Sequence, residues 1–291
     1  MEKYQSLSWT RGTEIWSSLK DQALTLLVPL LCLLAWKFYA SRLDNPVVLP
    51  YPETVLSIFF QPWKDVVGQG SLLQNMGISL ARVLAGFFLA ILVGVPVGLL
   101  MGYCPLLFKL FNGVLNFLRF VAPLAWMPLT LLWFGIASLA TLWGINEGPA
   151  YHWLNNIKLA MVFLIFIGAF FPIWIESIHA AQSVDRRFIE AALVLGASSR
   201  DVFFKVLLPG AAPHIVNGIR VGLGIAWRTV ISAEMIPGSL AGLGYLVWYS
   251  YSLWRTEVVL VGMAYIGIIG GALDLFFRWL AQRELHWFYR G

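Results

Sequence analysis

The sequence predicts an all-α integral membrane protein with about six transmembrane helices. Of the 291 residues, 59% are hydrophobic and only 12% are charged, whereas soluble domains carry about 25% charged residues. Several apolar stretches are also near or above the ~20 residues that a helix needs to cross ~30 Å of hydrocarbon. A soluble core that buried this much apolar surface would need a much larger protein, so lipid is the expected solvent.

Six stretches are the candidate crossings. They are residues 22–40, 80–101, 105–136, 157–178, 213–235 and 258–281. The third is too long for one straight helix, and Pro123 and Pro128 are expected to divide it into a shallow part and a crossing part. If both parts cross, the total becomes seven. Residues 22–291 then form the transmembrane domain, and residues 1–21 form either an amphipathic helix on the inner surface or a disordered tail.

The distribution of Lys and Arg predicts the orientation. With the amino terminus in the cytoplasm, eleven of these residues lie on the cytoplasmic side, namely Lys3, Arg11, Lys20, Lys109, Arg186, Arg187, Arg200, Lys205, Arg278, Arg283 and Arg290. The outer side holds Arg42, Lys64 and Arg255, with Lys158 at its edge. This bias satisfies the positive-inside rule, so both termini and residues 179–212 are expected in the cytoplasm. The net charge of +5 therefore needs no nucleic-acid partner.

The sequence contains no recognisable motif for ATP binding, catalysis or metal binding. It contains no Gly-x4-Gly-Lys-Ser/Thr phosphate loop, catalytic triad or metal motif. Cys32 and Cys104 are far apart and provide no disulfide framework. The first apolar stretch begins only after residue 21 and no small-residue cleavage site follows it, so we expect it to remain as a membrane helix. We expect a protein that is not an enzyme and holds no cofactor or metal itself.

Glycines recur on one face of the second crossing. Gly86, Gly94, Gly98 and Gly102 are spaced by four or eight residues, which allows neighbouring helices to approach closely. The face is either a surface that slides during transport or a static packing surface.

Residues 186–209 predict two short helices joined by a turn. Gly196 suits a left-handed cap after the first helix, and Ser198 with Asp201 has the spacing of a capping box for the second. Pro209 is expected to prevent that helix from continuing unbroken. The hairpin is too polar to cross a bilayer and too apolar on one face to be a loose loop. It offers a surface on which another protein can push.

The residue order in this hairpin resembles a known motif. Glu190-Ala191-Ala192, three residues, Gly196, nine residues and Val206-Leu207-Leu208-Pro209 are similar to the EAA loop of membrane subunits of binding-protein-dependent ABC importers, where Ile usually replaces Val206. An accidental match in an interfacial helix pair is the alternative. The resemblance implies the type I ABC importer permease fold. It also implies that Glu190, Ala191, Ala192, Gly196 and Pro209 couple the chain to an ATPase, with Glu190 making a charged contact and Gly196 setting the interhelical angle.

A second stretch resembles the nitrate, taurine and aliphatic-sulfonate branch of these importers. It is Pro123-Leu124-Ala125-Trp126-Met127-Pro128-Leu129, followed by Trp133-Phe134-Gly135-Ile136. Prolines free backbone carbonyls, which the membrane tolerates beside protein or a water-lined cavity. Pro123, Trp126, Met127 and Pro128 are therefore expected to line the translocation path, unless they form a simple packed kink. Residues 138–156 depart from that branch as an insertion, which either touches a solute-binding protein or is an interfacial loop.

The fifth crossing carries the most unusual polar residues. A charge at the centre of a membrane helix costs about 2.5–3.5 kcal/mol on insertion scales, so it is normally paired or wet. Arg228 lies mid-helix and either attracts an anion in the path or forms an ion pair with Asp274 or Glu176. Trp227 is expected in the path, and Glu234 either lines the gate or holds the turn at residues 242–244.

The resemblance implies a permease that works as a homodimer for nitrate, taurine, an alkanesulfonate or another small solute in a bacterial inner membrane. Its partners are ABC ATPase subunits carrying ATP and Mg, a periplasmic or lipid-anchored solute-binding protein, and membrane lipid. A stand-alone secondary transporter or channel is the alternative, but no internal repeat is visible. A membrane enzyme is disfavoured because the acidic residues in the crossings, Glu176, Glu234 and Asp274, are isolated in the sequence.

Overall fold

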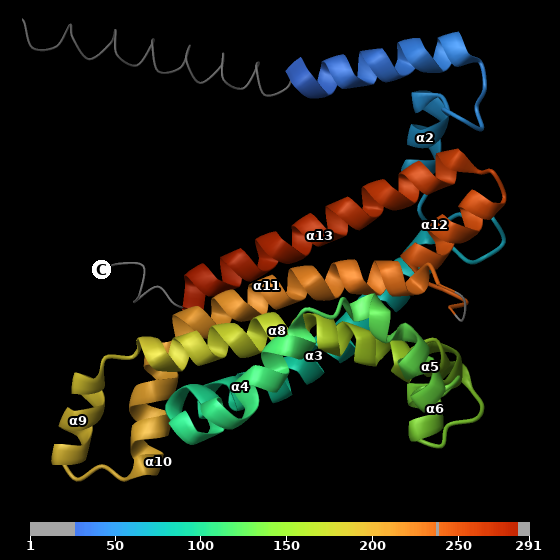
Figure 1. Ribbon diagram of the computed structural model, residues 1–291. Coiled ribbons are helices and arrows are strands. Elements are labelled where there is room, and N and C mark those ends of the chain that lie inside the picture. Colours follow the sequence, from blue (N-terminus) through green and yellow to red (C-terminus); the bar gives the residue numbers. More distant parts are fainter. Residues whose placement is uncertain (1–26, 237–238, 285–291) are drawn as a thin grey trace, which may run out of the picture.

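The computed structural model describes residues 27–236 and 239–284, and its regular elements there are all helical. The expected N-terminal segment 1–21 lies outside the described residues. Residues 27–43 form a helix that is followed along the chain by the elements of Figure 1. These are α2 (Pro52–Phe59), α3 (Leu72–Tyr103), α4 (Pro105–Arg119), η1 (Pro123–Trp126), α5 (Met127–Phe134), α6 (Leu139–Leu142), α7 (Pro149–Asn155), α8 (Leu159–Ser183), α9 (Arg186–Val194), α10 (Ser199–Val202), η2 (Phe203–Leu207), α11 (Leu208–Glu234), α12 (Leu243–Ser252) and α13 (Thr256–Glu284).

Helix α8 lies at the centre and packs along both α3 and α11. The predicted close approach through the glycine face of α3 is confirmed. A Cβ on Gly98 would lie 2.5 Å from the carbonyl oxygen of Trp174 in α8, and one on Gly86 would lie 2.8 Å from the carbonyl oxygen of Val162. On the other side, a Cβ on Gly222 of α11 would lie 3.1 Å from the carbonyl oxygen of Ala169. The three helices are therefore in near-backbone contact, which small residues permit.

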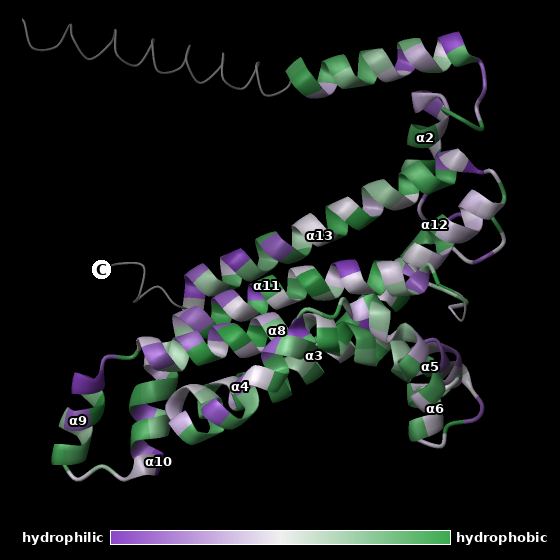
Figure 2. Cartoon of the chain, viewed as in Figure 1, coloured by the Kyte–Doolittle hydropathy of each residue, from purple (hydrophilic) through white to green (hydrophobic). Residues whose placement is uncertain are grey.

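The remaining helices surround this centre. Helix α13 packs against α11, α12 and α2, and the indole nitrogen of Trp227 in α11 donates to the Ile266 carbonyl of α13 at 3.1 Å. The helix at residues 27–43 lies at the edge of the molecule, far from the α9–α10 hairpin (Figure 1). Apolar residues run along most of that helix, α3 and α8, whereas α9 and the carboxyl-terminal turns of α13 carry many hydrophilic ones (Figure 2).

Four helices in the described part of the chain are long and apolar enough to cross a membrane: α3, α8, the run Ser199–Glu234 and α13. The third predicted crossing is divided as expected, since α4 and residues 123–134 meet at 94°. The break lies at residues 120–122, just before Pro123. Pro128 does not break the chain because it occupies the first turn of α5, where no backbone donor is required. The first predicted crossing, 22–40, lies partly outside the described residues.

The chain stays helical across Pro209. The α-helical geometry is interrupted, as expected, but by the π turn η2 rather than by a helix end. The Leu208 amide donates to the Phe203 carbonyl within that wider turn, and Pro209 then lies in the first turn of α11, where its missing N–H costs no hydrogen bond. One helical run of 36 residues, Ser199–Glu234, therefore joins the hairpin directly to the membrane-spanning part.

Replacing Gly98 with alanine tests the close packing of α3 on α8. The added methyl would press on the Trp174 carbonyl and on Ser177, and overpacking of this kind costs about 1–3 kcal/mol of stability. We expect a lower melting temperature for the purified Gly98→Ala protein in detergent. Gly113→Ala on α4 is the matched control, since nothing lies within 4 Å of its Cβ position. Equal melting temperatures for the two variants would contradict the packing.

Candidate functional site

The α9–α10 hairpin is built by local signals. Asp185 caps α9 by accepting from the Arg187 amide at 2.9 Å. Gly196 has a φ of +84°, so the predicted left-handed turn is present. The Ser198 hydroxyl accepts from the Asp201 amide at 3.2 Å and donates to the Asp201 carboxylate at 2.6 Å. The sequence therefore defines both the turn and the start of the second helix.

The tip of the hairpin exposes apolar side chains. Val194 and Leu195 are 88% and 87% exposed, and Phe188 is also largely exposed. Glu190 and Pro209, two of the predicted coupling residues, are exposed as well. An exposed apolar patch with polar neighbours is typical of a surface that binds another protein.

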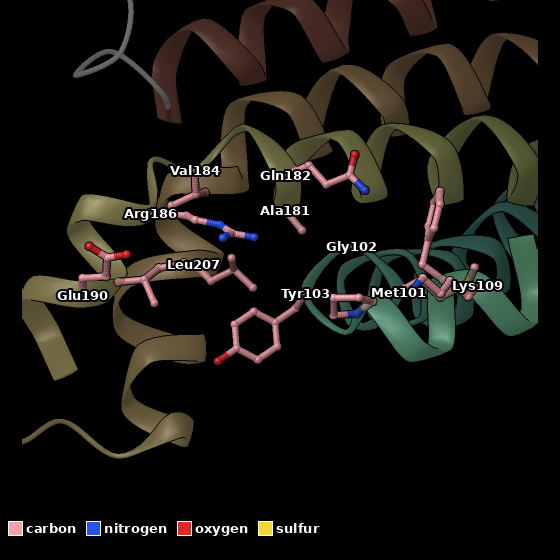
Figure 3. A pocket seen from close by; sticks show the side chains of 13 residues that line it. Met101, Gly102, Tyr103, Lys109, Ala181, Gln182, Val184, Arg186, Glu190 and Leu207 are labelled. Carbon is pink, nitrogen blue, oxygen red and sulfur yellow. The ribbon is translucent and has the colours of Figure 1, made fainter.

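A cleft lies at the base of the hairpin. It has a volume of about 760 Å³ and is bounded by the turn between α3 and α4, the end of α8, and α9. Figure 3 shows the Arg186 side chain extending from α9 into this space, opposite Tyr103 at the end of α3. Gln182 and Lys109 also line the cleft, and Glu190 stands at its hairpin side. The walls thus carry two cations, and the one carboxylate lies on the hairpin.

One face of α11 is open and partly polar. His214, Asn217, Val221, Gly224 and Arg228 are exposed along it at spacings of three and four residues, the spacing of a single helix face. The Arg228 guanidinium donates to the Gly224 carbonyl at 3.1 Å and forms no ion pair within the described part of the chain. The guanidinium can therefore face a water-filled space.

Neither carboxylate expected as a partner for Arg228 forms an ion pair with it. Asp274 accepts from Arg220 at 2.7 Å and from Arg278 at 2.9 Å. Glu176 lies against Gly218 of α11, whose Cβ position is 2.5 Å from the Glu176 Cβ. The alternative in which Arg228 is held by one of these carboxylates is not what the structure shows.

The other residues predicted for the path are divided between surface and interior. Pro128 is exposed, Pro123 and Trp126 are half-buried, and Met127 is buried. Trp227 is only 5% exposed and is hydrogen-bonded to α13, so it lies in the packed interior. Trp227 and Arg228 were both expected in the path, but consecutive helical residues face directions about 100° apart, and only Arg228 reaches the open face.

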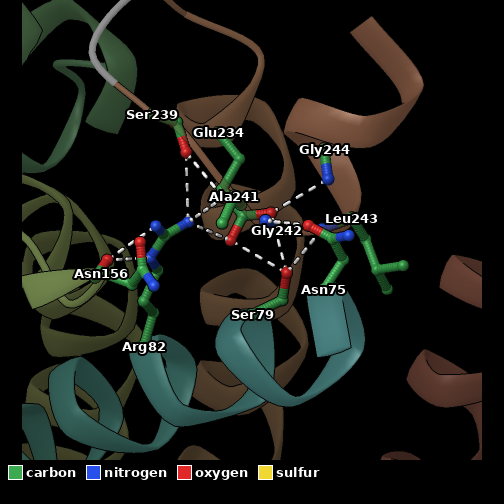
Figure 4. Close-up of polar contacts among 10 residues, drawn as sticks. All are labelled: Asn75, Ser79, Arg82, Asn156, Glu234, Ser239, Ala241, Gly242, Leu243 and Gly244. Atoms are coloured by element: carbon green, nitrogen blue, oxygen red, sulfur yellow. Dashed lines mark hydrogen bonds and ion pairs between the residues drawn. The ribbon is translucent and has the colours of Figure 1, made fainter. Parts of the chain in front are cut away.

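A buried polar network, shown in Figure 4, surrounds Glu234. Glu234 is the last residue of α11, so the network lies at the end of that helix opposite the hairpin. Arg82 of α3 and Glu234 of α11 form an ion pair at 2.7 Å with both side chains at most 1% exposed. The guanidinium also donates to the carbonyls of Asn156, at 2.7 Å and 2.8 Å, and Ala241, at 2.8 Å. The Ser79 hydroxyl lies 2.8 Å from the Glu234 carboxylate. Of the two roles expected for Glu234, its geometry fits holding the turn.

The turn at residues 242–244 is bound to the same network. The Gly244 amide donates to Glu234 at 3.0 Å, the Gly242 amide to Asn75 at 2.7 Å, and the Leu243 amide to Ser79 at 2.9 Å. Lys158, the residue just before α8, lies near this network. Its burial and the positive charge of Arg82 lower its pKa.

Asn75, Ser79 and Arg82 were not predicted from the sequence as functional residues. The available signal was one arginine within the apolar α3, since an unpaired charge there would be costly.

The described residues bring together no group of three or more His, Cys, Asp or Glu side chains that could hold a metal ion. Cys32 is exposed and Cys104 is half-buried, and both are free thiols. Three polar features of the described chain are candidates for function: the exposed hairpin with its basic cleft, the unpaired Arg228 on α11, and the buried Arg82–Glu234 pair at the far end.

Known proteins resemble this chain along most of its length. A protein named as an ABC transporter permease in Methanocaldococcus jannaschii is 41% identical over 277 residues, covering 95% of this chain and 96% of that protein. The taurine transport system permease of Escherichia coli is 34% identical, covering 87% and 84%. The bicarbonate transport system permease of Synechococcus elongatus is 30% identical, covering 93% and 92%.

A solved structure agrees on the fold. An inward-facing structure of the MetNI methionine ABC transporter contains a chain with a TM-score of 0.58 and 19% identity, covering 73% of this chain and 95% of that one. This likeness confirms the type I importer permease fold expected from the hairpin motif. Residues 86–286 match the family described as the binding-protein-dependent transport system inner membrane component. The chain is a multi-pass membrane permease and belongs to this family.

Proposed function

We propose that the chain forms the membrane path of an ATP-driven importer for a small anion. The observation that carries this proposal is Arg228, which is exposed on the open face of α11 and has no carboxylate partner in the described chain. A desolvated, unpaired arginine in a membrane would be costly, so water and a passing anion supply its missing interactions. The relatives named for taurine and bicarbonate transport support this, because both solutes carry an anionic oxygen group.

The α9–α10 hairpin supplies the contact with the ATPase in this proposal. Its exposed apolar tip fits a cleft on a partner protein, and Glu190 adds a charge at the base. The sequence has no phosphate loop of its own, so ATP and Mg are bound by separate ABC ATPase subunits. The positive-inside distribution of Lys and Arg supports a bacterial inner-membrane protein with the hairpin and both termini on the cytoplasmic side.

Two further partners complete the assembly that we propose. A second copy of this chain pairs with the first to enclose the path, and a periplasmic or lipid-anchored binding protein delivers the solute at the end opposite the hairpin. At that end the 138–156 insertion is a closed unit: Ser138 and Lys158 bridge its two ends, and the Ser138 hydroxyl lies 3.1 Å from the Asn155 side-chain oxygen. A compact insertion of this kind suits contact with the binding protein.

Replacing Gly196 with valine tests coupling. Valine is strained at a φ of +84°, whereas its Cβ position has no atom within 4 Å, so we expect the change to alter the hairpin angle without a steric clash at Cβ. Strain of about 1–3 kcal/mol at this turn opposes the coupled hairpin geometry, and ~1.4 kcal/mol corresponds to about tenfold. We therefore expect solute uptake per ATP hydrolysed to fall by about tenfold, measured with labelled bicarbonate and taurine in proteoliposomes containing the ATPase subunits.

Gly68→Val is the matched control for this experiment. Gly68 has a φ of +76° and also has nothing within 4 Å of its Cβ position, but it lies in the loop before α3, which has no role in the proposed contacts. The control should keep normal coupling. Normal coupling in Gly196→Val as well would remove the hairpin from this role.

Replacing Arg228 with methionine tests the anion path. We expect uptake of bicarbonate or taurine to fall by about tenfold or more, since the loss of even ~1.4 kcal/mol of anion attraction has this effect. Co-purification with the ATPase should be unchanged, because Arg228 contacts no other element through an ion pair. Arg228→Lys should retain most uptake, and Val221→Met on the same face should retain all of it. Unchanged uptake kinetics in Arg228→Met would exclude the arginine from the path.

A further inference from the structure

Helix α4 has one polar face. Lys109, Asn112, Asn116 and Arg119 follow one another at intervals of three, four and three residues, so they project from the same side of the helix. The opposite side carries exposed apolar residues, including Val114 and Phe117, which are 61% and 74% exposed. The helix is therefore amphipathic although it belongs to an apolar span, and its polar side needs water or polar partners.

This polar face borders a groove along α8, which we call the α4–α8 groove. It has a volume of about 260 Å³, and its polar lining consists of Asn112, Asn116 and Arg119 from α4 and His179 and Gln182 from α8. Phe108 and Gln182 line both this groove and the larger cleft at the base of the hairpin. The two spaces therefore adjoin and follow α4 for about 15 Å between Lys109 and Arg119.

Cations outnumber carboxylates along this route. No Asp or Glu lines the α4–α8 groove. Lys109 and Arg119 have no ion-pair partner in the described chain, and the Arg119 guanidinium lies 5.1 Å from the centre of the Phe120 ring. The one acidic residue of the adjoining cleft, Glu190, stands on the hairpin. The groove carries the Arg119 cation and no carboxylate, and the adjoining cleft carries Lys109 and Arg186 against that one carboxylate. This excess of positive charge attracts anions.

The groove also offers uncharged hydrogen-bond donors. The Asn116 amide nitrogen donates to the Asn112 side-chain oxygen at 2.6 Å and to the Asn112 carbonyl at 3.0 Å. This pairing leaves the Asn112 amide nitrogen without a protein acceptor among the described residues. Its N–H groups, together with the side chains of Gln182 and His179, can bind the oxygen atoms of a carboxylate, carbonate or sulfonate group.

We propose that the α4–α8 groove is the exit route by which the transported anion reaches the hairpin side. The inference rests on the proposed function for the cargo and for the direction of transport. The end of the groove farther from the hairpin lies at Arg119, the last residue of α4. After three intervening residues the chain enters η1, which packs against both α8 and α11. The groove therefore connects the region of the bent third span with the basic cleft at the base of the hairpin, and its cations lead from one to the other.

The test measures how fast introduced cysteines react in the complete complex with its ATPase subunits. The complex is held in membrane vesicles oriented so that the hairpin is on the surface exposed to the reagent. Cys32 and Cys104 are first replaced by alanine. Asn112→Cys and Asn116→Cys place a thiol in the groove, and Val114→Cys places one on the opposite face as the matched control. Each variant is treated with an anionic sulfonatoethyl methanethiosulfonate or a cationic trimethylammonioethyl analogue, with rates normalised to those of a free thiol.

We expect both groove cysteines to react and Val114→Cys to remain unreactive. The anionic reagent should be favoured by about tenfold, and Lys109→Gln or Arg119→Gln should reduce that preference. Modification of Asn116→Cys should also block uptake of labelled bicarbonate or taurine. Unreactive groove cysteines, a preference for the cation, or labelling in detergent but not in vesicles, as expected if lipid fills the groove, would each overturn the proposal. Full uptake after complete modification would do the same.

The reactivity arm needs neither cargo nor ATP, so its result is independent of the Arg228 experiment. If the groove cysteines favour the anionic reagent while Arg228→Met leaves uptake unchanged, the arginine has no place in the path and the groove retains its assignment as the anion route. If Arg228→Met impairs uptake while the groove cysteines are unreactive, the importer is supported and the exit must lie elsewhere.

Discussion

The buried ion pair between Arg82 and Glu234 is the interaction on which the arrangement of the helices depends. Removing two charges from water costs several kcal/mol per ion, and the pair is tolerated only when hydrogen bonds satisfy the remaining groups. Here the carbonyls of Asn156 and Ala241 accept from the guanidinium, while Ser79 and the Gly244 amide donate to the carboxylate. The partners come from α3, α11, the start of α12 and the chain before α8. These four parts are consequently joined at one end of the molecule.

Between the Arg82–Glu234 pair and the hairpin, α3, α8 and α11 pack against one another along their lengths. Helix α8 is held to α3 through Gly98 and to α11 through Gly222, and α11 continues through η2 into the hairpin. A force on the hairpin therefore acts on α8 and α11 together. Two interruptions of α-helical geometry lie near the hairpin side and the bent third span: the π turn η2 and the bend between α4 and η1. Both are next to the route proposed for the anion, where a change in helix angle would alter the width of the groove.

The parts that the sequence predicted are those governed by neighbouring residues. Gly196 and Ser198 lie within three residues of the turn and cap that they form, and the composition of each long helix determines its span. Pro209 was harder to interpret because a π turn can absorb a proline without ending the helix. Arg82 and Glu234 are 152 residues apart, and only the packing of α3 against α11 makes them a pair. The polar face of α4 was visible as a spacing, but the groove exists only because α8 lies opposite.

The structure separates two kinds of charge that the sequence could not distinguish. Arg82 and Arg220 are bound to carboxylates at 2.7 Å, and any anion that approached them would have to compete with a partner already in place. Arg228 and Arg119 have no such partner in the described chain, so an anion can gain their attraction without breaking an interaction that holds the fold. The free charges, rather than the most buried ones, are therefore the residues able to guide a solute. Fixed pairs between the helices and free cations along α4 and α11 allow one chain to remain rigid while it attracts and releases an anion.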